Sequence, residues 1–203
     1  MFTLERMIDE HVCLYEKLAE NAEKKSYVPP EGKVALPASY SKPEYEYLLS
    51  AIVSTYNSER FLRDCLDDLE RQTIADKLEI IVVNSGSQEN EEAIVREYQQ
   101  SHNNIVYIKT EHREGVYAAW NWAVKAVRGK FITNANTDDR HREDALEIMA
   151  KTLLANPDVA LVYGDQICTD TPNGTFANHH ATEIAKRPEY SQGRLLFGCC
   201  VGS

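Results

Sequence analysis

Residues 48–85 read LLSAIVSTYNSERFLRDCLDDLERQTIADKLEIIVVNS, in which one amphipathic segment separates two apolar runs. The runs, Leu48–Thr55 and Leu78–Val83, have the length and the nearly continuous apolar character of buried strands. Between them, apolar residues at three- and four-residue spacing predict a helix, which Asn57 or Ser58 would cap. The buried face of this helix would consist of Phe61, Leu62, Cys65, Leu66 and Leu69.

The same alternation continues along the chain. Further strands are predicted at Ile105–Lys109, from Phe131–Ile132 onward, and at Val159–Tyr163. Further helices are predicted at Glu89–His102, at Val116–Val127, which Gly129 would end, and at Arg142–Ala155. Because nearly continuous apolar strands alternate with helices, we expect an α/β, Rossmann-like fold: a mostly parallel sheet with helices on both faces.

Two segments precede this predicted sheet. Residues 1–25 have the apolar spacing of an amphipathic helix, and residues 26–46, which hold four of the seven prolines, are interpreted as an extended linker. The main domain is predicted to span residues 47–203. The N-terminal helix could dock on this domain, pair with a second copy in a homo-oligomer, or end a preceding domain.

Charge and composition exclude several classes of function. The 203 residues include 22 Lys and Arg against 32 Asp and Glu, a formal net charge of −10, which argues against a nucleic-acid-binding surface. No apolar run approaches the roughly 18 residues that span a bilayer, and charged residues interrupt the N-terminus where a signal peptide would be apolar. We therefore expect no transmembrane segment and a cytoplasmic location, either free or peripheral at the inner face of the membrane.

Polar segments follow the predicted strands, where ligands bind in open α/β sheets. None contains a Gly-x-Gly-x-x-Gly or Walker pattern, so a dinucleotide site or a P-loop is not favoured. The segments are residues 54–59, 84–87, 111–115 and 134–140.

Asp138 and Asp139 are adjacent carboxylates directly after a predicted strand. Their mutual repulsion would be relieved by a hard cation, since Mg²⁺ or Mn²⁺ is held by one or two carboxylates plus substrate phosphates. The alternative is that one of them caps the following helix.

Four segments, in this order along the chain, resemble the motifs of family 2 glycosyltransferases of the GT-A fold. They are Val53-Ser54-Thr55-Tyr56-Asn57; Ile81-Val82-Val83-Asn84-Ser85-Gly86-Ser87; Gly115 with Ala119, Asn121 and Ala123; and Gly129-Lys130-Phe131-Ile132 leading into Asn136-Thr137-Asp138-Asp139. The resemblance covers about Leu48 to Ser203. It implies a metal-dependent, inverting transferase of polysaccharide biosynthesis, with a nucleotide-diphosphate sugar as donor and a saccharide or lipid-linked acceptor.

The resemblance also implies roles for individual residues. The metal, Mn²⁺ or Mg²⁺, would be held by Asp138 and Asp139, and Arg113 would lie near the diphosphate. The remaining nucleotide-binding residues would be Thr55, Tyr56 and Glu59 around the base, Asn84 and Ser85 where the family usually has aspartates, and Asn136 at the ribose.

The sequence departs from the family pattern at Asn84 and Asn136, which replace usual aspartates. An amide still forms hydrogen bonds but carries no charge, so metal binding would rest on Asp138, with help from Asp139. We expect weak metal affinity that depends on the substrate phosphates. Because the net charge of −10 repels a diphosphate at long range, binding should need the cation and Arg113.

The catalytic base is harder to assign. Family members place it well downstream of the metal motif, and we expect this chain to be truncated before that point. Asp165 is the candidate within the chain, although it could instead orient the donor sugar or cap a turn. Two alternatives stay open: a fragment that binds a nucleotide sugar without transferring it, and a nucleotidylyltransferase, whose usual Gly-rich basic loop is absent from residues 54–59.

Overall fold

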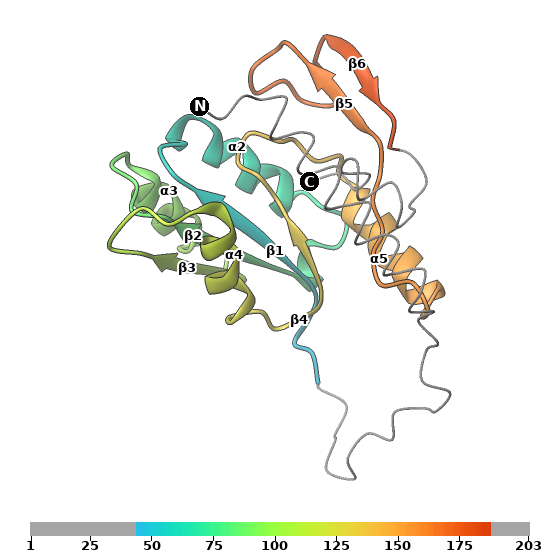
Figure 1. The fold of residues 1–203 in the computed structure, drawn as a ribbon, viewed down its shortest axis with the longest axis horizontal. Coiled ribbons are helices and arrows are strands. Elements are labelled where there is room, and N and C mark those ends of the chain that lie inside the picture. The colour runs from blue at the N-terminus through green and yellow to red at the C-terminus, as the bar shows by residue number, and fades with distance from the viewer. Residues whose placement is uncertain (1–43, 188–203) are drawn as a thin grey trace, which may run out of the picture. The chain divides into compact units, whose positions relative to one another are not determined.

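The computed structural model describes residues 44–187, which contain a four-stranded sheet and a separate hairpin (Figure 1). The larger sheet has the order β3-β2-β1-β4, and all of its pairings are parallel. Its strands are β1 (Tyr47–Thr55), β2 (Leu78–Asn84), β3 (Ile105–Lys109) and β4 (Gly129–Asn134). The predicted parallel α/β sheet is therefore confirmed. The predicted helix over residues 1–25 and most of the predicted linker lie outside the described residues.

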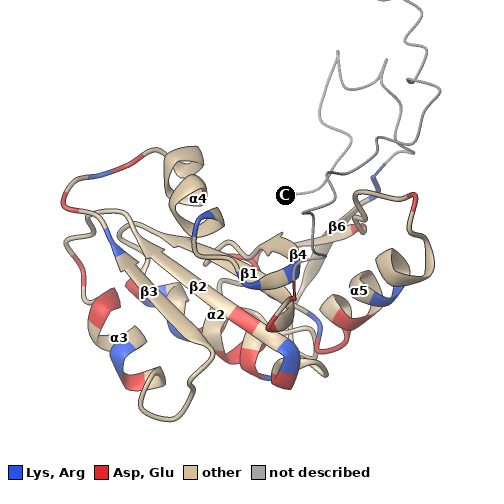
Figure 2. Ribbon diagram, turned by 90° about the horizontal axis from the view of Figure 1, so that it is seen from below, with Lys and Arg blue, Asp and Glu red and all other residues tan. Residues whose placement is uncertain are grey.

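Helices cover both faces of this sheet. Helices α2 (Glu59–Glu70), α3 (Glu91–Tyr98) and α5 (Ala145–Ala155) lie on one side, and α4 (Val116–Val124) lies on the other, as Figure 2 shows. A short 3₁₀ turn, η1 (Ala75–Lys77), leads into β2. Within residues 44–187, no helix combines the length and the apolar character that crossing a bilayer requires.

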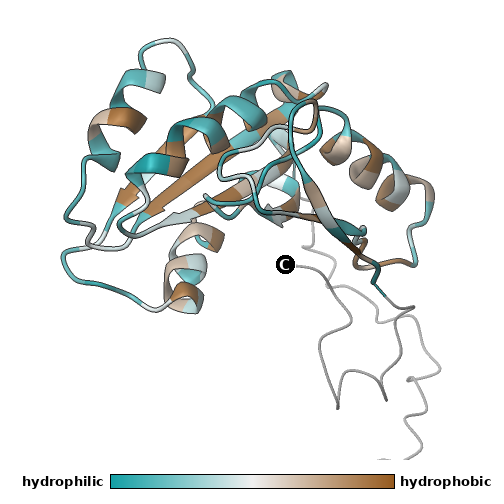
Figure 3. Ribbon diagram, turned by 90° about the horizontal axis from the view of Figure 1, so that it is seen from above, coloured by the Kyte–Doolittle hydropathy of each residue, from teal (hydrophilic) through white to brown (hydrophobic). Residues whose placement is uncertain are grey.

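The core divides into two layers because successive strand residues point to opposite faces. Ala51, Val53 and Val82 belong to the layer under α2 and α3, whereas Ile52 and Ile81 belong to the layer under α4. All of these side chains are buried, so the apolar band in Figure 3 runs through the centre of the sheet. The continuous apolar character of the first two strands follows from burial on both faces.

One predicted strand is wrong. Residues 159–163 form no strand, and the chain instead makes an antiparallel hairpin of β5 (Gln166–Thr169) and β6 (Ala181–Ala185). Val159 and Leu161 of the predicted strand are 43% and 55% exposed. An apolar run becomes a strand only where a sheet edge accepts its backbone hydrogen bonds, and no strand among the described residues pairs with this run.

Three predicted helices are shorter than expected. α3 covers Glu91–Tyr98 instead of Glu89–His102, α4 ends at Val124 instead of Val127, and α5 begins at Ala145 instead of Arg142. Residues just beyond the end of a helix can continue its spacing although they form a turn. Spacing alone therefore predicts helices that extend too far.

Gly129 does not end a helix, contrary to the prediction. It is the first residue of β4, and a Cβ atom there would lie 2.6 Å from the Ser50 backbone nitrogen and 2.7 Å from the Leu49 carbonyl carbon. The Gly129 N–H donates to Ser50 Oγ at 2.9 Å. Glycine is therefore required because β4 packs directly against the backbone of β1.

A buried carboxylate completes this edge of the sheet. Glu79 of β2 is fully buried and accepts hydrogen bonds from Ser50 Oγ at 2.5 Å and from the backbone and Nε of Arg128 at 2.9 and 2.6 Å. The Arg128 guanidinium also pairs with Glu46. These hydrogen bonds and the Arg128 charge compensate the buried Glu79 carboxylate. Glu79 lies near the start of β2, at the opposite end of the strand from its carboxyl end.

We predict that Gly129→Ala lowers the free energy of unfolding by about 2 kcal/mol, because the new methyl group overlaps backbone atoms that cannot move independently. Urea denaturation would measure the effect. Gly164→Ala is the control, since its Cβ would meet only the flexible end of Met149 at 3.7 Å. Equal stability of the two variants would contradict the close packing of β4 on β1.

Candidate functional site

Backbone hydrogen bonds join the carboxyl ends of three neighbouring strands. Thr55, the last residue of β1, pairs with Asn84 of β2, and the Ser85 N–H then donates to the Thr55 carbonyl at 2.9 Å. On the other side of β1, the Ala135 N–H donates to the Ile52 carbonyl at 2.7 Å. The loops that follow β1, β2 and β4 therefore start from one edge of the sheet.

The loop after β3 packs against this group. The Arg113 guanidinium lies 4.3 Å from the centroid of the Tyr56 ring, within cation–π range. Gly86 has a φ of +64°, and a Cβ there would lie 2.7 Å from the His112 carbonyl carbon. The structure thus brings together two predicted site residues, Tyr56 and Arg113, from loops more than fifty residues apart in sequence.

Asn84 and Ser85 are buried and use their side chains to shape this edge. Asn84 Oδ1 accepts the Ser87 N–H at 2.8 Å, and Asn84 Nδ2 donates to the Tyr107 hydroxyl at 3.0 Å. Ser85 Oγ accepts the Glu114 N–H at 2.6 Å and lies 3.0 Å from the Glu114 carbonyl oxygen. Both side chains therefore hold neighbouring loops, and their contact with a base stays a prediction.

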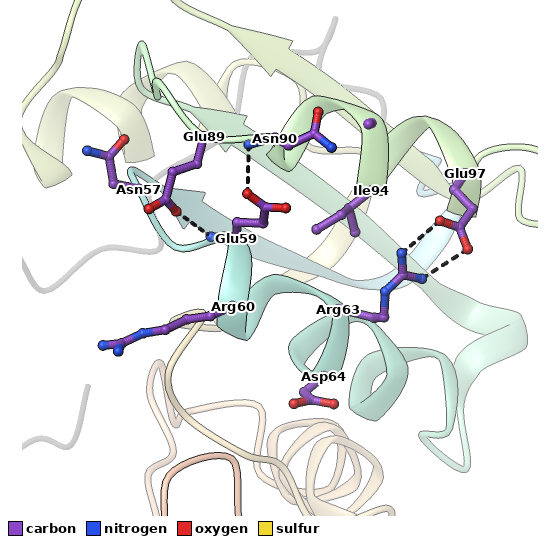
Figure 4. A pocket seen from close by; sticks show the side chains of 10 residues that line it. Asn57, Glu59, Arg60, Arg63, Asp64, Glu89, Asn90, Ile94 and Glu97 are labelled. Carbon is purple, nitrogen blue, oxygen red and sulfur yellow. Dashed lines mark hydrogen bonds and ion pairs between the residues drawn. The ribbon is translucent and has the colours of Figure 1, made fainter.

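Glu59 lies in a different environment from Thr55 and Tyr56. Its carboxylate accepts the Asn90 N–H at 3.2 Å, while its own N–H donates to Glu89 Oε2 at 3.0 Å (Figure 4). At the start of α2 and at the start of α3, a carboxylate thus accepts a backbone N–H from the other helix start. Glu59 lines a pocket of about 730 Å³ between α2 and α3, whose lining includes neither Thr55 nor Tyr56.

The loop after β4 presents the predicted metal ligands. Asn136 Nδ2 donates to Asp139 Oδ2 at 2.9 Å, and the Asp139 N–H donates to the Asn136 carbonyl at 3.2 Å. Asp138 is exposed and has no hydrogen-bond partner among residues 44–187. Helix α5 begins only at Ala145 with Asp144 at its N-cap, so the alternative role of Asp138 or Asp139 as a cap is wrong.

These donors suit a cation shared with a substrate. Within the described part of the chain, no three His, Cys, Asp or Glu side chains form a group that could hold a metal alone. Asp138 and Asp139 supply two adjacent exposed carboxylates, which matches the habit of Mg²⁺ and Mn²⁺ of taking one or two carboxylates plus phosphate oxygens. The residues fit a divalent cation that binds together with a diphosphate.

Asp68 of helix α2 holds the loop of residues 136–141, here called the acidic loop. Asp68 accepts two hydrogen bonds from Arg140, from Nε at 2.6 Å and from Nη2 at 2.7 Å, and a third from the His141 N–H at 3.0 Å. The side-chain hydrogen bonds to Asp68 raise the pKa of the Arg140 guanidinium. Arg140 Nη1 also donates to the Asn173 carbonyl at 2.9 Å, which ties the acidic loop to the β5–β6 hairpin.

Cys65 packs beneath the same loop. Its Sγ lies 3.8 Å from the Asn136 carbonyl oxygen, and burial, with a smaller contribution from nearby aspartates, raises the pKa of its thiol to about 12. The thiol is therefore a neutral packing group at neutral pH. The sequence predicted correctly that Cys65 lies in the core. It did not predict that Asp68 supports the acidic loop; the position of this carboxylate beside the apolar face of α2 could have indicated it.

Asp165 lies apart from these contacts. It precedes β5, and its Oδ1 accepts the Arg187 N–H at 2.8 Å. Among the residues described, no hydrogen bond or ion pair joins Asp165 to the loop of residues 136–139. Its role as a base stays a prediction.

The match to a known family decides the classification. The glycosyl transferase family 2 model matches residues 50–201, a span that contains every strand-end loop described above. The chain belongs to glycosyl transferase family 2. Among family relatives, an uncharacterized glycosyltransferase of Methanocaldococcus jannaschii is 34% identical over 117 residues, which are 57% of this chain and 40% of the relative.

Solved structures of glycosyltransferases share the fold of this family 2 chain. Residues 1–349 of S. aureus TarS in complex with UDP are 27% identical, with a TM-score of 0.50 over 54% of this chain and 32% of that 1–349 chain. The mannosyltransferase PcManGT of Pyrobaculum calidifontis in complex with GDP-Man and Mn²⁺ is 25% identical, with a TM-score of 0.50 over 80% of this chain and 44% of the other. The chain spans less than half of the length of each of these relatives.

We predict that Asp68→Ala lowers the free energy of unfolding by about 2 kcal/mol, because it leaves the nearly buried Arg140 guanidinium without its carboxylate. Urea denaturation monitored by circular dichroism would measure this loss. Glu97→Ala is the matched control: it removes a carboxylate that also accepts two bonds from one arginine, Arg63, but on the exposed surface. A loss in the control as large as in Asp68→Ala would show that burial of the Arg140 pair does not matter.

Proposed function

We propose that this chain is the nucleotide-sugar-binding part of a metal-dependent, inverting glycosyltransferase. The observation that carries the proposal is the exposed Asp138 carboxylate, which has no internal hydrogen-bond partner in the described part of the chain and sits in a loop that starts at the carboxyl edge of a parallel sheet. Ligands bind beyond this edge in open α/β sheets. A carboxylate kept free there is available to a cation.

The donor is a nucleotide-diphosphate sugar. TarS is known with UDP and PcManGT with GDP-Man and Mn²⁺, which supports this class of donor and a divalent metal. The two neighbours carry different bases, so the base stays open for this chain. The nucleotidylyltransferase alternative is not favoured, since the family match covers residues 50–201.

In this proposal, each loop contributes one part of the donor site. Thr55, Tyr56 and Asn84 lie around the base, and Arg113, stacked on Tyr56, offers a positive charge to the diphosphate. Asn136 contacts the ribose. The predicted set also includes Ser85 and Glu59, whose side chains accept hydrogen bonds from backbone N–H groups of neighbouring loops.

Asp138 and Asp139 would hold Mn²⁺ or Mg²⁺ together with the phosphates. When bound, the ion supplies positive charge that stabilises the negative charge developing on the departing diphosphate. With a net charge of −10, the chain gains diphosphate affinity only through such local neutralisation.

The proposed reaction is a direct displacement at the anomeric carbon. A hydroxyl oxygen of a saccharide or lipid-linked acceptor forms the new bond, the bond to the diphosphate breaks, and a carboxylate takes the hydroxyl proton, which inverts the anomeric configuration. Asp165 is the candidate base within the 203 residues. If Asp165 is not the base, the same residues bind the donor without transferring the sugar.

We predict that Asp138→Ala abolishes the dependence of UDP or GDP binding on Mn²⁺, because the free carboxylate is lost from the loop. Isothermal titration with each nucleotide, with and without Mn²⁺, should give a Kd at least about tenfold weaker in the variant, or about 1.4 kcal/mol. Asp158→Ala, which removes an exposed carboxylate in the turn after α5, is the control with the same charge change.

Unchanged Mn²⁺-dependent binding in Asp138→Ala would remove Asp138 from the site. Assaying the same 203 residues for sugar transfer separates the two forms of the proposal. Transfer that disappears in Asp165→Asn would assign the base to Asp165, and donor binding without any transfer would favour the binding fragment.

A further inference from the structure

Glu91 is a fully buried carboxylate at the first position of α3, within the strand-end region. Its Oε1 accepts the Ser58 N–H at 2.8 Å and lies 3.4 Å from Thr55 Oγ1. Both of its oxygens lie 2.6 Å from Ser87 Oγ. One carboxylate thus contacts the end of β1, the start of α2 and the loop after β2.

A second set of bonds joins the same two loops. The Asn57 N–H donates to Ser87 Oγ at 3.0 Å, and the Gln88 N–H donates to Asn57 Oδ1 at 3.0 Å. Asn57 has a φ of +51°, a left-handed conformation that asparagine tolerates better than most residues. The loop after β1 therefore has a specific conformation that is fastened to the loop after β2.

The physical cost of opening this contact is high. Within residues 44–187, no ion pair joins Glu91 to a lysine or arginine, so its charge is compensated by N–H and O–H donors and by its place at the start of α3. Separation of the two loops would remove these donors and leave a buried charge unpaired. The buried carboxylate therefore disfavours conformations in which the loops move apart.

We infer that Glu91 is a positioning residue for the nucleotide site: it latches the loop after β1 to the loop after β2 and so holds Tyr56 in place beside the paired strand ends that carry Thr55, Asn84 and Ser85. The inference rests on the proposed function. Glu91 itself is fully buried, so its effect on a ligand passes through these residues.

The test compares two buried carboxylates, Glu91 at the start of α3 and Glu79 near the start of β2. Glu91→Gln changes the latch, and Glu79→Gln changes the equally buried carboxylate at the opposite end of β2. Both variants should lose stability. Well below the melting temperature, only Glu91→Gln should weaken the binding of UDP or GDP with Mn²⁺, by about tenfold in Kd, as is usual when a group supporting a site is changed.

Ser87→Ala provides a second variant if Glu91→Gln does not fold. It removes the hydroxyl that links Glu91 to Asn57 and should weaken nucleotide binding in the same direction. Wild-type Kd values in both Glu91→Gln and Ser87→Ala, or an equal loss in Glu79→Gln, would overturn the inference.

Amide hydrogen exchange separates this inference from the proposed function. The Asn57 and Ser58 amides should exchange faster in Glu91→Gln than in the wild type, and should not change in Glu79→Gln. If the wild type binds neither nucleotide, the proposed function fails and with it the functional role of Glu91. Unchanged exchange in Glu91→Gln would show that the latch itself does not exist.

Discussion

The parallel pairing of β1 between β2 and β4 is the constraint on which the rest of the structure depends. Ile52 of β1 pairs with Ile81 on one side and with Asn134 on the other. Because the three strands run in the same direction, the loops that follow them must start from the same edge. A shift of the register by one residue would exchange the side chains of the two core layers under α2 and α4, so the packing of both layers and the position of the site are determined together.

Carboxylates have two distinct uses in this acidic chain. Glu79, Glu91 and Asp68 are buried or nearly so, and each accepts several hydrogen bonds that join segments distant in sequence. Asp138, in contrast, is exposed and without such bonds among the described residues. This difference in environment separates carboxylates that hold the fold together from the exposed carboxylate that we propose binds a cation, a distinction that net charge alone cannot make.

Much of the fold could be predicted because period and length carry strong signals in the first half of the chain. The strand Ile105–Lys109 is as expected, and the buried face of α2 contains the expected Leu62, Cys65, Leu66 and Leu69. The predictions failed where local signals were ambiguous. Val159–Tyr163 is apolar but has no strand partner in the described structure, and Gly129, expected to end a helix, is required by contact with β1.

The sequence by itself determined the alternation of strands and helices, the polar segments after each strand and the adjacent carboxylates of Asp138 and Asp139, because each of these is a local pattern. Only the tertiary structure decided which polar groups meet. The sequence predicted a local cap for α2, yet the Ser58 and Glu59 amides donate to Glu91, the first residue of α3, and to Glu89 of the preceding loop. Such partners lie about thirty residues away, and hydrogen bonds at that separation exist only once the strands have paired.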